Sequence, residues 1–151
     1  HLNRANSEEV DPQTPHPVIH TIPDQVRILK HRAYGGTMRL GSWECIVKPH
    51  TLAYAAYQAH HQFIKGMKGL TTERHRHRYE FNEAYVPQFE QAGVIFAGRS
   101  VKENLVELME LPTSMHPFFV GTQGHPEYKS RPLRPHGLFI DFLLAARNYQ
   151  K

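Results

Sequence analysis

The chain has 151 residues, of which 40% are hydrophobic and 21% are charged, and these proportions exclude a globally disordered protein. The sequence has no apolar run of the roughly 20 residues that a membrane-spanning helix needs, and its single cysteine excludes an internal disulfide framework. A lone cysteine is typical of a reducing compartment, so we expect a cytoplasmic protein without a membrane partner, while the formal net charge of +4 indicates anionic partners only weakly.

The N-terminal third favours strands and one short helix. Its first twenty residues are polar and contain three prolines, which predicts an irregular segment that leads to a short apolar run at 18–22. Two glycines at 35–36 predict a turn, and the β-branched and aromatic residues of 37–49 predict one or two strands. Thr51 can cap a short helix over 52–58.

The middle of the chain contains a second short helix that includes residues 86–92. Pro87 suits its first turn, where the missing N–H has no helical partner to lose. Tyr85, Phe89 and Ala92 recur at helical spacing, so we expect them to form one buried face.

The C-terminal part combines strands with a longer helix. The runs at 94–100 and 105–111 predict a hairpin, and residues 118–123 predict a third strand. A helix over 137–150 should pack against the sheet, and no linker divides the chain. The apolar residues at helical spacing are Leu138, Phe139, Phe142, Leu143 and Ala146.

His125 and Glu127 flank a proline just past a predicted strand. Residues i and i+2 of an extended segment point to the same side, so the carboxylate can hydrogen-bond one imidazole nitrogen while the other nitrogen takes up a proton. Such a pair is the base and its orienting acid in a nucleophilic triad. On its own, His-Pro-Glu is a weak signal, and a surface loop is the commoner explanation.

A basic stretch lies earlier in the chain, at 73–80, and reads Glu-Arg-His-Arg-His-Arg-Tyr-Glu. Its arginines could bind nucleic-acid phosphates while its tyrosine stacks on a base. His75 and His77 could also share a metal ion, although no further Cys/His pair has the spacing of a structural zinc site. A solvated charged strand is the simpler explanation, so we expect no bound metal and no nucleic acid.

Cys45 must be tested as a nucleophile because it is the only thiol. A nucleophile at a strained strand-to-helix turn needs small neighbours, usually glycines. The flanking residues Trp43, Glu44, Ile46 and Val47 are instead ordinary strand residues. We therefore expect Cys45 to be a buried structural residue, which leaves the chain without a cysteine nucleophile.

Several motifs occur together and in order along the chain. They are ANSEE, GGTMRLG, ERHRHRYEFN, QAGVIFAGRS, VELMELP, HPFFV, HPE and the KSRP…RPHGLF segment. Together they resemble the glutaminase domains of the CTP synthase family, which are class I glutamine amidotransferases. GGTMRLG and ERHRHRYEFN are specific to this branch, whereas HPE is shared with other class I glutaminases. The resemblance covers essentially residues 1–151, as the C-terminal half of one such domain, a single partial domain.

The resemblance implies a mechanism and four site residues. In this family a cysteine attacks the side-chain amide of glutamine, and His125 would relay protons while Glu127 orients it. Glu9 falls on the family's glutamine-binding acid and Arg78 on its glutamine-binding arginine. Opposite charges suit a free amino acid, because glutamine carries both an ammonium and a carboxylate.

The resemblance also implies what the chain should lack. In the family, the cysteine and the glycine-rich oxyanion loop precede ANSEE, so we expect an α/β fold, a central sheet flanked by helices, without the N-terminal half of the domain. The polypeptide alone should then be inactive, and the alternative is a non-catalytic glutaminase-like binding or regulatory module. Gly124 also replaces the bulky aromatic that the family usually places before HPE, which should loosen the support of His125.

Partners and cofactors follow from the same resemblance. The family passes ammonia to a synthetase domain, which aminates ATP-activated UTP to give CTP. We therefore expect glutamine and a synthetase domain of the same enzyme as partners, a homo-oligomer such as a tetramer, and ATP and Mg in the synthetase domain. No cofactor is expected in these 151 residues.

Overall fold

The computed structural model describes residues 2–21 and 39–149, so the turn predicted at 35–36 lies outside the described residues. In these residues, eight strands form two sheets, accompanied by three α-helices and two 3-10 helices. The strands are β1 (Ala5–Ser7), β2 (His16–Thr21), β3 (Arg39–Val47), β4 (Leu70–His77), β5 (Tyr79–Phe81), β6 (Ile95–Ser100), β7 (Val106–Leu111) and β8 (Phe119–Thr122). The helices are α2 (Leu52–Ala59), η1 (Glu83–Tyr85), α3 (Val86–Gln91), η2 (Pro126–Tyr128) and α4 (Gly137–Asn148).

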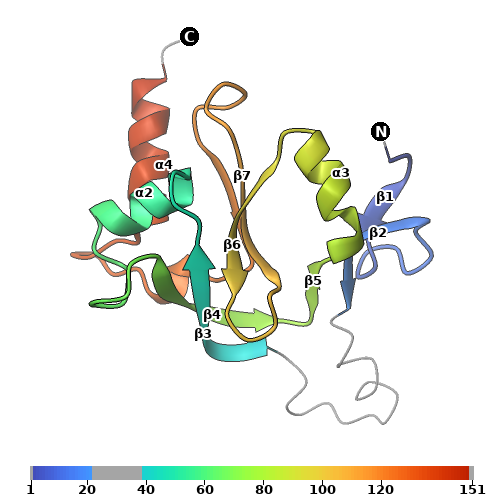
Figure 1. Ribbon diagram of the computed structural model, residues 1–151, viewed down its shortest axis with the longest axis horizontal. Helices are drawn as coiled ribbons and strands as arrows, with labels where there is room; N and C mark the ends of the chain where they lie inside the picture. Colours follow the sequence, from blue (N-terminus) through green and yellow to red (C-terminus); the bar gives the residue numbers. More distant parts are fainter. Residues whose placement is uncertain (1, 22–38, 150–151) are drawn as a thin grey trace.

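The larger sheet has the strand order β4-β3-β6-β7-β8, with every neighbouring pair antiparallel. The smaller sheet has the order β1-β2-β5, in which β1 and β2 are parallel. Figure 1 shows α2 and α4 at one end of the molecule, and α3 with the smaller sheet at the other. The α/β prediction is confirmed, with the strands divided between two sheets.

Two apolar cores lie on opposite faces of the larger sheet. Phe96 and Ala97 are adjacent on β6, so their side chains point to opposite faces. Ala97 joins a cluster that Tyr57 of α2 and Leu138 of α4 complete. Phe96 packs on Phe81 in a second cluster, at 5.0 Å between ring centroids, beneath α3 and the smaller sheet. The sheet thus holds the α2–α4 layer and the α3 layer apart.

Most predicted elements lie where the sequence placed them. The helix capped by Thr51, the short proline-led helix α3, the β6–β7 hairpin and strand β8 are confirmed. The expected buried face of α3 is only partly correct, because Tyr85 and Phe89 are half-buried whereas Ala92 is exposed. The prediction of an irregular N-terminal segment is wrong in one respect, since residues 5–7 form β1 through parallel pairing with β2. Such a long-range pairing leaves no periodic signal in three residues.

The prediction that α4 packs against the sheet is only partly correct, because Leu138 in the first turn joins the cluster on β6 and β7 whereas the main partner of the helix is α2. Its first turn is buried, but α4 then runs beside α2, and much of its apolar surface faces outward. Phe142 is 52% exposed and Leu143 is 65% exposed. Helical spacing correctly predicted that the apolar side chains of α4 form one stripe, but spacing alone cannot identify the element that this stripe contacts.

A buried carboxylate from the sheet caps α2 and gives the first prediction. Glu110 accepts hydrogen bonds from the backbone N–H groups of Leu52 and Ala53, at 2.9 and 3.1 Å. Glu110→Ala leaves both donors unpaired and should lower the free energy of unfolding by about 2 kcal/mol. Urea denaturation measures the loss, and Glu110→Gln, which keeps one acceptor oxygen, should lose less. Equal stability of Glu110→Ala and the parent would contradict this capping role.

Candidate functional site

The predicted histidine and glutamate are in direct contact. His125 Nδ1 lies 2.7 Å from an oxygen of Glu127, as the sequence predicted. The backbone that joins them differs from the prediction, because residues 126–128 form the 3-10 helix η2 and His125 is its N-cap. The contact therefore comes from a tight helical turn and not from an extended segment.

Three hydrogen bonds attach this loop to β4, and one ring stacking orders the loop itself. The backbone N–H of His125 donates to the carbonyl of Arg74 at 2.8 Å, and the Lys129 ammonium donates to the carbonyl of Thr72. The Tyr128 ring stacks on the His125 imidazole, with ring centroids 5.3 Å apart, and Arg76 donates to the Tyr128 hydroxyl at 2.7 Å. These contacts fix both the position and the plane of the imidazole.

Gly124 gives the loop its close approach to β4. A Cβ atom at this position would lie 2.8 Å from the Cβ of Glu73, closer than side-chain carbons ever pack. A bulky residue therefore does not fit between this backbone and β4. The sequence analysis expected Gly124 to loosen the support of His125, but here the absence of a side chain permits direct packing.

The electrostatics of the pair suit a proton relay. Partial burial raises the pKa of the Glu127 carboxyl, but the His125 hydrogen bond opposes this effect, so the pKa lies below its usual value. Glu127 is therefore ionised at neutral pH and accepts the Nδ1–H of His125. This bond leaves Nε2 as the nitrogen that can exchange a proton with a reacting group. The His125 side chain is 32% exposed, so a substrate can reach it.

A cavity of about 540 Å³ brings Glu9 and Arg78 together. Glu9 belongs to the turn between β1 and β2, and Arg78 joins β4 to β5. The preceding Glu8 is occupied with the backbone N–H of Thr21, whereas the Glu9 side chain is exposed. The Nε of Arg78 is buried and has no hydrogen-bond partner in the part of the chain that the structure describes. The cavity thus offers one acid and one incompletely paired guanidinium.

Two residues that line the cavity connect it to the His125 loop. Gln123 lines it two residues before His125, and Arg76 lines it while holding the Tyr128 ring against the imidazole. The sequence analysis missed Arg76, Gln123 and Tyr128. A partial signal existed for Arg76, because it shares the exposed face of β4 with Arg74, whereas nothing in the sequence places Tyr128 over His125.

The two histidines of the basic stretch, buried His75 and half-buried His77, form a hydrogen-bonded chain that reaches this cavity through His77. His75 Nδ1 lies 2.8 Å from His77 Nε2, and His77 Nδ1 lies 2.9 Å from the carbonyl oxygen of Tyr79. Glu107 approaches the other nitrogen of His75 at 3.5 Å. Burial lowers the pKa of His75 to about 3 and that of His77 to about 4, so both imidazoles are neutral and hydrogen-bonded to each other.

The neutral His75 predicts a specific pH dependence of stability. Its pKa is lowered on folding, so the unfolded chain binds an extra proton between pH 6.5 and about 3. The free energy of unfolding should therefore fall through this group as the pH drops below 6.5, by up to about 1.4 kcal/mol per pH unit. His75→Gln removes this proton, so the parent should lose stability faster than the variant between pH 6.5 and 4 in urea titrations. If the free energy of unfolding changed with pH equally in parent and variant, this prediction would be wrong.

Cys45 lies where the sequence analysis expected it. The side chain is 2% exposed within β3, and its sulfur packs close to Gly98 of β6. Burial raises the pKa of the thiol, with the carboxylates of Glu107 and Glu73 adding to the rise. A thiol that resists ionisation and has no access to the His125 imidazole is not suited to nucleophilic attack.

The described residues were also compared with what a metal site and a membrane-spanning helix require. Residues 2–21 and 39–149 contain no group of three or more His, Cys, Asp and Glu side chains arranged to hold a metal ion. In the same residues, no helix combines the length and apolar character of a membrane crossing.

Comparisons with known proteins point in one direction. The family model described as glutamine amidotransferase class-I matches residues 21–145. The chain is 49% identical over 150 residues to a CTP synthase from Mycobacterium tuberculosis, covering 99% of this chain and 24% of that protein. It is 51% identical over 147 residues to a CTP synthase from Pelotomaculum thermopropionicum, covering 97% of this chain and 25% of that protein. The chain thus spans about a quarter of the length of these relatives.

A solved structure shares the fold. The glutaminase domain of Trypanosoma brucei CTPS with bound acivicin superposes with a TM-score of 0.79 at 27% sequence identity. The alignment covers 99% of this chain and 53% of that chain. The architecture described above is therefore that of about half of the neighbour's chain.

Proposed function

Because the chain belongs to the class-I glutamine amidotransferase family, we propose that its residues bind glutamine and relay the protons of amide hydrolysis within a CTP synthase. The single observation that carries this proposal is the His125–Glu127 contact of 2.7 Å beside a cavity lined by Glu9 and Arg78. The resemblance stated from the sequence and the family match support the same assignment.

In the proposed reaction, His125 Nε2 first takes the proton of a cysteine thiol. The thiolate attacks the side-chain amide carbon of glutamine, and the imidazolium then gives its proton to the leaving nitrogen, so that ammonia departs and a thioester forms. A water molecule attacks the thioester, His125 accepts its proton, and glutamate leaves as the thiol is restored. Glu127 stabilises the imidazolium in both halves of the cycle.

The nucleophile in this proposal lies outside the 151 residues, because Cys45 is buried and the raised pKa of its thiol opposes formation of the thiolate. The exposed apolar surface of α4 is where we place the rest of the glutaminase domain. Phe142 and Leu143 are large side chains whose burial would stabilise such a contact. On this account the 151-residue polypeptide alone hydrolyses no glutamine.

Glutamine recognition follows from charge. Arg78 would pair with the α-carboxylate of glutamine and Glu9 with its α-ammonium, which positions the side-chain amide toward His125. The ammonia would pass to a synthetase domain of the same protein for ATP-dependent amination of UTP to CTP. ATP and Mg²⁺ belong to that domain in the proposal, and we propose a cytoplasmic homo-oligomer, a tetramer, as its assembly.

The experiment that tests the proposal is an assay of the full-length protein with glutamine, ATP, Mg²⁺ and UTP. We expect CTP and glutamate to form in equal amounts, because each amide nitrogen transferred leaves one glutamate. Glutamine binding without glutamate release would instead support the non-catalytic module.

A further inference from the structure

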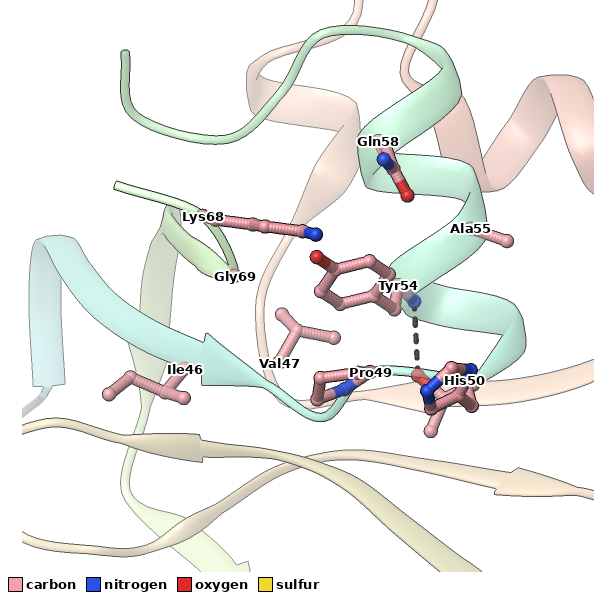
Figure 2. A pocket seen from close by; sticks show the side chains of 10 residues that line it. Ile46, Val47, Pro49, His50, Tyr54, Ala55, Gln58, Lys68 and Gly69 are labelled. Atoms are coloured by element: carbon pink, nitrogen blue, oxygen red, sulfur yellow. Dashed lines mark hydrogen bonds between the residues drawn. The ribbon is translucent and has the colours of Figure 1, made fainter. Parts of the chain in front are cut away.

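A second cavity of about 570 Å³ lies apart from the glutamine site and shares no lining residue with it. It is an open pocket between the end of β3, one side of α2 and the loop that precedes β4 (Figure 2). Apolar groups form much of its wall. They come from Ile46, Val47, Pro49, Ala55 and Gly69.

One polar group in this cavity has no partner. Tyr54 is only 7% exposed, and its hydroxyl oxygen is buried without a hydrogen bond in the described part of the chain. The ring packs on Phe63 at 4.9 Å between centroids, which restricts its rotation. A buried hydroxyl without a partner costs stability, so a ligand group that reaches it from the cavity gains a hydrogen bond that the described residues do not supply.

Two further polar side chains that can donate hydrogen bonds, Lys68 and Gln58, line the same cavity. Figure 2 shows Lys68 extending across the cavity toward the Tyr54 hydroxyl. Gln58 lies one helical turn after Tyr54, so its amide borders the same side of α2. An ammonium can only donate, while a phenol and a primary amide can each donate as well. Among the residues that the structure describes, those lining the cavity include no carboxylate.

We propose that this cavity binds a small organic acid that has an apolar body and one carboxylate. The carboxylate accepts from the Tyr54 hydroxyl and the Lys68 ammonium, and the apolar body lies on Val47, Pro49 and Ala55. Lys68 is an exposed side chain next to Gly69, so it can move to admit the ligand and return to pair with it.

The test uses calorimetric titration of the full-length protein with benzoate, benzyl alcohol and benzylamine, which are similar in size and differ in charge. We expect saturable binding of benzoate and at least tenfold weaker binding of the other two, because only benzoate offers the carboxylate. Absence of saturable benzoate binding, or equal binding of benzyl alcohol, would overturn the proposal.

Variants locate the site and separate ligand binding from structure. Tyr54→Phe and Lys68→Met should each weaken benzoate binding about tenfold or more, while Lys65→Met, a loop lysine outside the cavity, should leave it unchanged. Arg78→Ala should also leave it unchanged, which excludes benzoate binding in the glutamine cavity. Since the Tyr54 hydroxyl makes no hydrogen bond with residues 2–21 and 39–149, Tyr54→Phe should not lower the unfolding midpoint. Benzoate binding that survives in both cavity variants would contradict the assignment.

Discussion

Replacing His125 with alanine in the full-length protein should abolish glutamine hydrolysis, lowering the rate of glutamate release by about a thousandfold or more. The reason is that Nε2 is the group that moves protons in both halves of the proposed cycle, and its partner nitrogen is held by Glu127 at 2.7 Å. Release of glutamate from labelled glutamine measures the loss directly. The effect should lie in kcat, because the imidazole is not proposed to bind the ground-state substrate.

Glu127→Gln is the matched variant for this prediction. It keeps the geometry of the pair but removes the negative charge that stabilises the imidazolium, so we expect a smaller loss of about 10- to 100-fold. Glu127 is 53% exposed, and water partly screens its charge, which also limits the loss. A Glu127→Gln loss as large as that of His125→Ala would indicate that the pair acts through its fold and not through charge.

Replacing Arg78 with alanine should raise the KM for glutamine by about 100-fold with a smaller change in kcat, since a charge-assisted pair with the α-carboxylate is lost. Arg78 suits this role because its buried Nε lacks a hydrogen bond within the described residues and its side chain lines the same cavity as Glu9. Steady-state kinetics with varied glutamine measure the change. Arg78→Lys should recover only part of the affinity, because an ammonium cannot pair with two oxygens as a guanidinium does.

Arg74→Ala is the control for Arg78, because it removes an arginine of the adjoining strand β4 whose side chain does not line the cavity. Its KM for glutamine should remain near that of the parent. Glu9→Gln should raise the KM about tenfold, less than Arg78→Ala, because Glu9 is exposed. Equal KM values for the parent and Arg78→Ala would remove Arg78 from the glutamine site.

Local chemistry made much of the fold predictable from sequence. Thr51 and Pro87 mark helix starts through hydrogen bonding and backbone geometry that involve only neighbouring residues, and both helices are confirmed. The pairing of β1 with β2 and the outward face of α4 depend on contacts between distant segments. Composition and spacing within one element carry no information about such contacts.

The candidate site was likewise predictable where neighbouring residues determine it and not where distant segments meet. The contact between His125 and Glu127 was predicted because the two residues are neighbours in sequence, although the backbone is a 3-10 turn. The convergence of Glu9 and Arg78 on one cavity required the family resemblance, because 69 positions separate them and neither has a local signal. The stacking of Tyr128 on His125 depends on the route of the loop over β4, which the sequence does not specify.

The central claim is that His125 serves amide hydrolysis and not the synthesis of CTP. The most direct test is the rate of CTP formation by the full-length His125→Ala protein with glutamine and with ammonium chloride in parallel. Ammonia supplied from solution bypasses the hydrolysis of glutamine, so the account predicts parent-like rates with ammonium and almost none with glutamine. Equal loss with both nitrogen sources would contradict the account, because it would show that His125 maintains the structure of the protein and takes no part in releasing ammonia.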